Sequence, residues 1–147
     1  MKVKVSRKPL GKVLDDPIDE AMRYYANANE ILQKKGGIDA MTKFYTDKKY
    51  VRLAGHCYYS GILIALDGLM TRTNYDLTLK PGARKSVNTY KTFLKVIGNR
   101  TLQSYFNEIY DVAHLHMGYD GTGSLYIVAD DIFLRIIEQI KIEMSKR

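Results

Sequence analysis

The chain of 147 residues has one cysteine, no tryptophan and three prolines. Its cysteine, Cys57, cannot form an internal disulfide, and it lies in an apolar stretch where cysteine behaves as a small hydrophobic residue. The N-terminal sequence MKVKVSRKPLGK has no apolar run of signal-peptide length. The longest weakly charged stretch, Leu53–Met70, contains a histidine and an aspartate, which disfavours a membrane span. We therefore expect a cytoplasmic protein that does not cross a membrane.

Acidic residues are absent from Leu77–Asn107, although this stretch contains six basic residues. The whole chain has a formal net charge of +7, and a positive surface attracts phosphates over a long range. A second basic cluster lies in an N-terminal arm, residues 1–16. Aromatic residues are not interleaved with these charges as they are on a surface that stacks the bases of a single strand. The candidate binding residues are Arg84, Lys91, Lys95 and Arg100, and the candidate partners are nucleic acid or an acidic protein.

A length of 147 residues suits a single domain, which we place at residues 17–147, after the arm. Its most informative segment is Tyr50–Met70, because nearly every side of a helix with this sequence is apolar or small. One face contains large residues such as Tyr58 and Leu66, and the adjoining face contains small ones such as Ala54 and Gly61. A helix of this kind belongs in the middle of a bundle.

Turn and capping residues divide the chain into five helical segments. Asp16 followed by Pro17 is a typical helix start, and Gly36-Gly37 is a typical helix end. The expected helices cover about residues 17–35, 47–71, 83–97 and 102–117, with a last helix that contains Ile132, Phe133, Ile136, Ile137 and Ile140. Ser124 or Thr122 is expected to cap this last helix. We therefore predict an all-α fold, an up-and-down bundle of four to five helices.

The central helix has one polar seam, formed by Arg52, His56 and Ser60 at four-residue steps, with Asp67 near the same line. These side chains could bind an anion or perform acid–base chemistry, because a histidine titrates near neutral pH and an arginine stabilises a phosphate. The alternative is that the seam is the least buried stripe of the helix. In that case Arg52 and Asp67 pair with neighbouring residues.

Two further motifs contain residues of the kind that bind a metal or a phosphate. His114 and His116 point about 200° apart on a regular helix, and no third and fourth ligand accompanies them, even with Asp111 and Asp120 nearby. The glycines at 118, 121 and 123 lack the lysine and the hydroxyl residue of a phosphate-binding loop. We therefore expect no metal and no cofactor, and a plain turn between the last two helices.

The segments PIDEAMRYYANANEIL, KKYVRLAGHCYYSGILIALDGLM and NEIYDVAHLHMGYDG resemble a family of small bacterial proteins that is similar to the HEPN superfamily of helical bundles. The resemblance implies a homodimer. In catalytic HEPN members, four to six residues separate an arginine from a histidine, whereas three separate Arg52 from His56, and Tyr105 stands five positions after Arg100. The resemblance therefore implies a non-catalytic module that binds nucleic acid or an acidic protein. The alternative is a toxin-type, metal-independent ribonuclease with a degenerate site that uses Arg52 and His56, or His114 supplied across a dimer interface.

Overall fold

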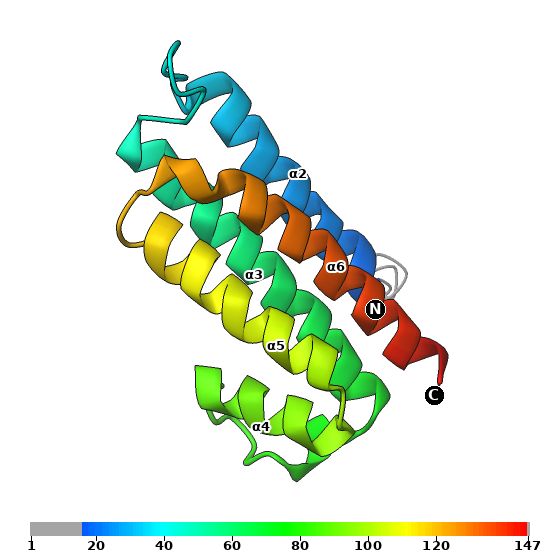
Figure 1. Cartoon of the computed structure of the whole chain (residues 1–147). Coiled ribbons are helices and arrows are strands. Elements are labelled where there is room, and N and C mark those ends of the chain that lie inside the picture. Colours follow the sequence, from blue (N-terminus) through cyan, green and yellow to red (C-terminus); the bar gives the residue numbers. More distant parts are fainter. Residues whose placement is uncertain (1–15, 147) are drawn as a thin grey trace, which may run out of the picture.

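The computed structural model describes residues 16–146, and within this range the chain forms an all-α helical bundle without strands (Figure 1). The α-helices are α2 (Pro17–Lys35), α3 (Lys48–Arg72), α4 (Val87–Ile97), α5 (Arg100–Ile109) and α6 (Tyr126–Ser145). Between them lie two 3-10 turns, η1 (Tyr75–Thr78) and η3 (Gly123–Leu125), and a π-helical segment, η2 (Tyr110–Met117). The predicted fold class is confirmed. The basic arm, up to residue 15, lies outside the described residues.

The long helices alternate in direction, which gives the predicted up-and-down arrangement (Figure 1). Helix α3 lies in the middle and contacts α2, α6 and η2, while α5 continues directly into η2 and contacts α6. The short α4 packs beside α5 at one end of the bundle. Among the described residues, no helix combines the length and the apolar character needed to cross a bilayer.

The core forms around α3, as its sequence predicts. The large side chains of Tyr58 and Leu66 are fully buried, and so are the small residues Ala54 and Ala65 on the adjoining face. Small residues allow neighbouring helices to approach closely, because no long side chain holds the two backbones apart. The isoleucines and Phe133 expected on one face of α6 are also buried, so the predicted apolar faces of α3 and α6 are both confirmed.

Helix ends agree with the sequence at some positions and differ at others. Asp16 caps α2 by accepting hydrogen bonds from the backbone of residues 18 and 19, and Asp47 caps α3. The predicted cap of the last helix is wrong, because neither Thr122 nor Ser124 caps α6, and the residue before α6, Leu125, makes no side-chain cap. The prediction for the third helix is also wrong at its start. It begins at residue 87, because Ser86 and Thr89 form a capping box there.

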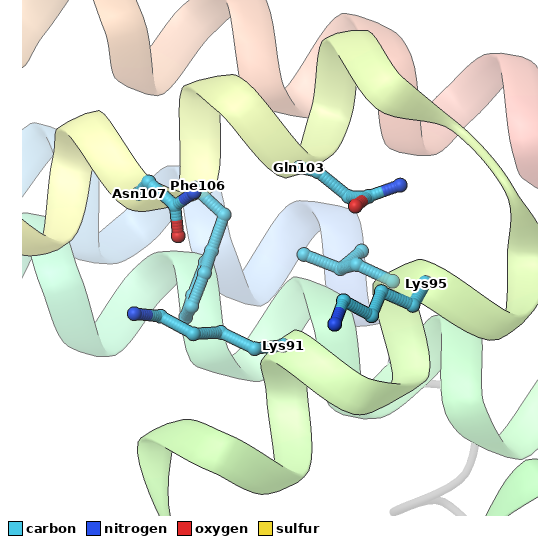
Figure 2. Close-up of a pocket in the computed structure, with 6 residues that line it drawn as sticks. Lys91, Lys95, Gln103, Phe106 and Asn107 are labelled. Carbon is cyan, nitrogen blue, oxygen red and sulfur yellow. The ribbon is translucent and has the colours of Figure 1, made fainter.

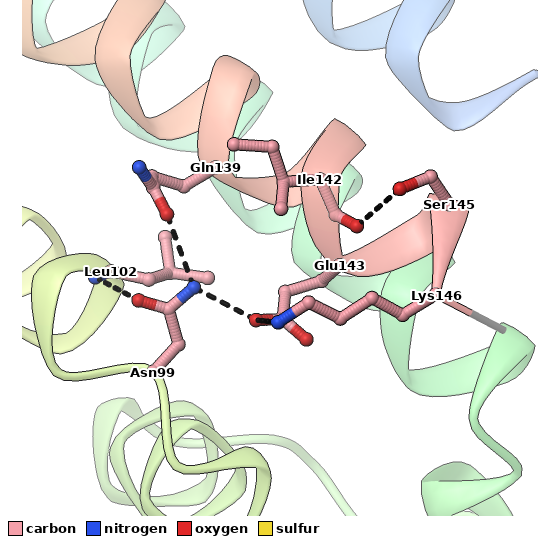
Figure 3. A network of polar contacts seen from close by, with 7 residues as sticks. All are labelled: Asn99, Leu102, Gln139, Ile142, Glu143, Ser145 and Lys146. Atoms are coloured by element: carbon pink, nitrogen blue, oxygen red, sulfur yellow. Dashed lines mark hydrogen bonds and ion pairs between the residues drawn. The ribbon is translucent and has the colours of Figure 1, made fainter.

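Two polar networks tie distant helices together. Asn99 caps α5 through its Oδ1 atom, and its Nδ2 atom donates to Gln139 and to Glu143 on α6 (Figure 3). On the other side of the bundle, Tyr25 of α2 and Tyr58 of α3 donate to the carboxylate of Asp130, at 2.7 Å and 3.2 Å. Burial, together with this carboxylate, raises the pKa of Tyr25 to about 12. Both networks join segments that lie far apart in the sequence.

Candidate functional site

Two histidines meet where α3 contacts η2. The ring centroids of His56 and His114 are 5.9 Å apart, with the planes close to perpendicular. The ring of Tyr119 closes the cluster, at 5.8 Å from His56 and 5.2 Å from His114. Tyr119 is 61% exposed, so an aromatic face is open to solvent beside the two imidazoles. We call His56, His114 and Tyr119 the histidine cluster.

The cluster forms because the two backbones approach unusually closely. A side chain at Gly55 of α3 would place its Cβ atom 2.6 Å from the carbonyl oxygen of Ala113. A Cβ atom at Gly118 would lie 2.8 Å from Cε1 of His56. In η2 the amide of Gly118 bonds to the oxygen of Ala113, five residues earlier, and such π-helical turns are frequent at functional sites. Two glycines therefore set the position of the histidine rings.

The surroundings of His114 favour its neutral form. Its Nδ1 atom is buried and has no hydrogen-bond partner within the described part of the chain. Burial lowers the pKa of His114 below its ordinary value, and the nearby His56 lowers it further, because both effects disfavour a positive charge. A neutral imidazole at neutral pH retains a lone pair that can accept a proton.

The structure separates the residues of the polar seam into two places. Arg52 lies at the histidine cluster, where its Nε atom donates to the backbone oxygen of Tyr119 at 3.0 Å. Asp67 is engaged elsewhere, since Tyr90 donates to it at 2.9 Å and Lys85 forms an ion pair with it at 3.1 Å. Arg52 and Asp67 therefore pair with neighbouring residues, as the structural interpretation of the seam requires. The three residues of the ribonuclease alternative nevertheless all contact Tyr119. Arg52 bonds to its backbone oxygen, and the rings of His56 and His114 pack against its ring.

A basic side chain of α4 lies over a tyrosine ring that neighbours the histidine cluster. The Nζ atom of Lys91 lies 5.5 Å from the ring centroid of Tyr110, and that ring lies 5.1 Å from the ring of His114. Aromatic residues are not interleaved with the basic residues in the sequence, but in the fold the ring of Tyr110 lies beside Lys91. Tyr110 is 19 positions after Lys91 in the chain, so only the packing of η2 beside α4 and α5 brings them together.

Two of the four candidate basic residues line the same pocket. Lys91 and Lys95 line a small pocket between α4 and α5, with a volume of about 90 Å³ (Figure 2). Arg84 precedes the first turn of α4, so the predicted line of Arg84 with Lys91 and Lys95 along one helix is wrong. Arg100 is exposed at the first position of α5 and does not line the pocket. The other residues of the pocket, which the sequence did not indicate, are Leu94, Gln103, Phe106 and Asn107.

The second histidine of the His-x-His motif points away from the first. His116 lies 3.5 Å from the carboxylate of Asp120, and both side chains are more than half exposed. His114 instead packs against Tyr59, whose ring centroid lies 4.3 Å away. Within residues 16–146, no group of three histidine, cysteine or acidic side chains has the geometry of a metal site.

Fold and site together define an all-α helical-bundle protein with a histidine cluster beside a basic pocket. The family model for a domain of unknown function, DUF5618, matches residues 16–141. The chain therefore belongs to this family. It is also similar to a solved structure, a protein of unknown function from Dyadobacter fermentans, with 35% sequence identity and a TM-score of 0.73. That match covers 85% of this chain and 94% of the other, whereas no curated protein matches.

Proposed function

We propose that the protein is a HEPN-like module that binds single-stranded RNA on the face formed by α4, α5 and η2. The contact of Lys91 with the ring of Tyr110 carries this proposal, because it joins the basic pocket to the aromatic rings of the histidine cluster. Single strands are bound where positive charge follows the backbone and aromatic rings stack the bases. The positive charge of Lys91 and the aromatic ring of Tyr110 lie side by side on this face.

The charges on this face are available to a partner. None of the ion pairs among residues 16–146 involves Lys91 or Lys95, whereas Lys85 is already paired with Asp67. An acidic protein would satisfy the two lysines equally well. The exposed ring of Tyr119 and the neighbouring imidazoles favour RNA, because every base offers a face that can stack on them.

Two other expectations accompany this proposal. The HEPN-like resemblance predicts a homodimer. The composition and the absence of a signal-peptide run predict a cytoplasmic location. A dimer would present two copies of the basic face, and this would strengthen the binding of a longer strand through a high effective concentration. The size of the particle in solution can be measured by light scattering.

We expect Lys91→Glu combined with Lys95→Glu to weaken the binding of a fluorescent oligouridine by tenfold or more. Two fewer phosphates would be neutralised, so a plot of log affinity against log salt should become shallower by about 1.4. Fluorescence anisotropy at several salt concentrations measures both quantities. The matched control is Lys35→Glu combined with Lys141→Glu, which changes the net charge equally at exposed positions on α2 and α6.

The proposal predicts that RNA binding is lost only when the charges are reversed on α4. The α2 and α6 control should bind RNA within about twofold of the unchanged protein. An equal loss in both double variants would show that only net charge matters, and an unchanged affinity in the α4 variant would exclude this face. If the protein retains an acidic protein partner but binds no oligouridine at any salt concentration, the basic face recognises carboxylates and not RNA.

A second function, metal-independent RNA cleavage, is favoured by the meeting of Arg52, His56 and His114 at one place. The neutral imidazole of His114 would accept the proton of a ribose 2′-hydroxyl, whose oxygen then forms a bond to phosphorus. The bond from phosphorus to the 5′-oxygen breaks, and that oxygen takes a proton from His56, which would act as the general acid. Arg52 would stabilise the negative charge on the phosphate in the transition state.

Cleavage would be recognised by its dependence on both histidines. With a chelator present, we expect labelled RNA to be cut by the unchanged protein and to survive with His56→Ala or His114→Ala, since general acid–base catalysis contributes about 100-fold to 10,000-fold. His116→Ala is the control, because His116 is exposed and faces Asp120. RNA that stays intact with the unchanged protein would limit the function to binding.

A further inference from the structure

We infer that the pocket between α4 and α5 is a subsite for one phosphate group of the bound strand. This inference rests on the proposed RNA binding and names the group that occupies one particular place on that face. The pocket is lined by Lys91 and Lys95 of α4 and by Gln103, Phe106 and Asn107 of α5, which face one another (Figure 2). Leu94 completes the lining.

The size of the pocket selects the kind of group that enters it. Its volume is about 90 Å³. Sites for drug-sized molecules are several times larger, at roughly 300–1,000 Å³. The pocket therefore accepts a single small group and excludes a whole nucleoside. Among the parts of an RNA strand, the phosphate is the one that combines small size with negative charge.

The polar side chains around the pocket suit an anion with several oxygens. Lys91 and Lys95 stand one helical turn apart on α4, and Gln103 and Asn107 stand one turn apart on α5. Each ammonium group brings three N–H donors, and each carboxamide brings two. No acidic side chain lines the pocket. Four donor side chains can bind the non-bridging oxygens of a phosphate from two sides, and bonds between ammonium groups and anionic oxygens are among the stronger hydrogen bonds.

The floor of the pocket strengthens these contacts. Leu94 is 1% exposed and Phe106 is fully buried, so the inner side of the pocket is apolar and closed to water. Attraction between opposite charges is stronger where the local dielectric constant is lower. An ammonium group beside this floor therefore attracts an anion more strongly than the same group on an open surface.

The place of the pocket also determines where the adjoining nucleotide lies. Lys91 lines the pocket and at the same time lies over the ring of Tyr110. A phosphate bound by Lys91 therefore places the attached base next to the ring of Tyr110. The pocket binds the backbone of the strand, and the base stacks on the ring of Tyr110.

The first test observes the pocket directly. The side-chain amide signals of Gln103 and Asn107 are followed by nuclear magnetic resonance in the full chain during titration with uridine 5′-monophosphate, uridine or inorganic phosphate. We expect both signals to move with the monophosphate and with phosphate, and to stay in place with uridine. Signals that do not respond to either phosphate compound would overturn the inference, and so would signals that respond only to a polyglutamate peptide.

The second test removes the neutral donors without changing the charge. Gln103→Leu combined with Asn107→Leu should weaken oligouridine binding about tenfold, which corresponds to about 1.4 kcal/mol for the lost hydrogen bonds. Ser104→Leu is the control, because it adds the same side chain to an exposed position on α5 outside the pocket. Circular dichroism melting curves show whether each variant is folded. Oligouridines with and without a 5′-phosphate distinguish a terminal phosphate from an internal one.

The two proposals can fail separately. If the charge-reversal variant loses RNA while the double leucine variant binds like the unchanged protein, the basic face binds RNA but the pocket holds no phosphate. If the unchanged protein binds no RNA, both proposals fail together. Loss of binding in both variants, with Ser104→Leu unaffected, supports the phosphate subsite.

Discussion

Asn99→Ala is expected to lower the free energy of unfolding by about 3 kcal/mol. Asn99 has two functions, since its Oδ1 atom accepts the backbone amide of Leu102 at 2.9 Å and its Nδ2 atom donates to Glu143 at 2.9 Å. Loss of the helix cap costs about 1 kcal/mol, and loss of a hydrogen bond to a charged group costs about 1.5–3 kcal/mol. The side chain of Glu143 is buried, at 2% exposure, so water has little access to replace the donor, although the ion pair of Glu143 with Lys146 at 3.2 Å is kept. Urea unfolding followed by circular dichroism gives the free energy.

A matched cap on the preceding helix isolates the contribution of the hydrogen bond between Asn99 and Glu143. Ser86 caps α4 at an exposed position, so Ser86→Ala should cost only about 1 kcal/mol. An equal cost for Asn99→Ala and Ser86→Ala would show that the contact between Asn99 and Glu143 adds nothing to stability.

Asn99→Asp separates the two contributions further, because it keeps the acceptor for the helix cap and replaces the donor with a carboxylate next to Glu143. The repulsion raises the pKa of the introduced carboxyl in the folded state above its unfolded value of about 3.9. The free energy of unfolding of the variant should therefore be closer to that of the unchanged protein in acid. It should fall as the pH rises through this raised pKa. Unfolding at about pH 4.5 and about pH 7.5 tests the sign.

The long-range architecture was predictable because the decisive signals are local. The sequence of α3 is apolar or small on nearly every side, and this pattern alone places it inside a bundle. Asp16 was readable as a cap because it precedes a run with helical spacing, and the start of α3 near residue 47 was predicted as well. A cap depends on the residues within one turn of it, so tertiary contacts seldom change it.

The errors occurred where a competing local interaction decided the outcome. The third helix starts at residue 87 and not at 83, because the capping box of Ser86 and Thr89 ends the loop there. The last helix starts without a side-chain cap, although Thr122 and Ser124 are residues that cap helices elsewhere. The bridging 3-10 turn η3 occupies the place where the cap was expected.

Only part of the candidate site could be predicted from the sequence. Arg52 and His56 share a helix face, so their spacing was sufficient to group them. Tyr110 and the carboxamides of the pocket carried no such signal, because their neighbours come from α4, a separate helix. The π-helical form of η2 was not predictable either, since the apolar spacing of this segment is compatible with an ordinary helix.

Gly55→Ala is expected to lower the free energy of unfolding by about 2 kcal/mol and to separate the histidine cluster. The added Cβ atom would lie 2.6 Å from the oxygen of Ala113 and 2.7 Å from the amide nitrogen of Gly118, which are backbone atoms that cannot rotate away. Overpacking of this kind costs about 1–3 kcal/mol or more, and the better helix propensity of alanine returns about 1 kcal/mol. Urea unfolding measures the net loss, and the ring signals of His56 and His114 report the displacement of η2.

The control for this prediction is Gly82→Ala, where a Cβ atom meets nothing within 4 Å but the backbone has a φ of +76°. Its cost comes from backbone strain alone, about 1–2 kcal/mol, and it should leave the signals of His56 and His114 unchanged. We therefore expect Gly55→Ala and Gly82→Ala to lower the free energy of unfolding by similar amounts, but only Gly55→Ala to displace the histidine cluster. A displaced histidine cluster in Gly55→Ala alone would show that close packing of α3 against η2 holds the imidazoles together, whereas unchanged histidine signals would show that η2 can move without disturbing them.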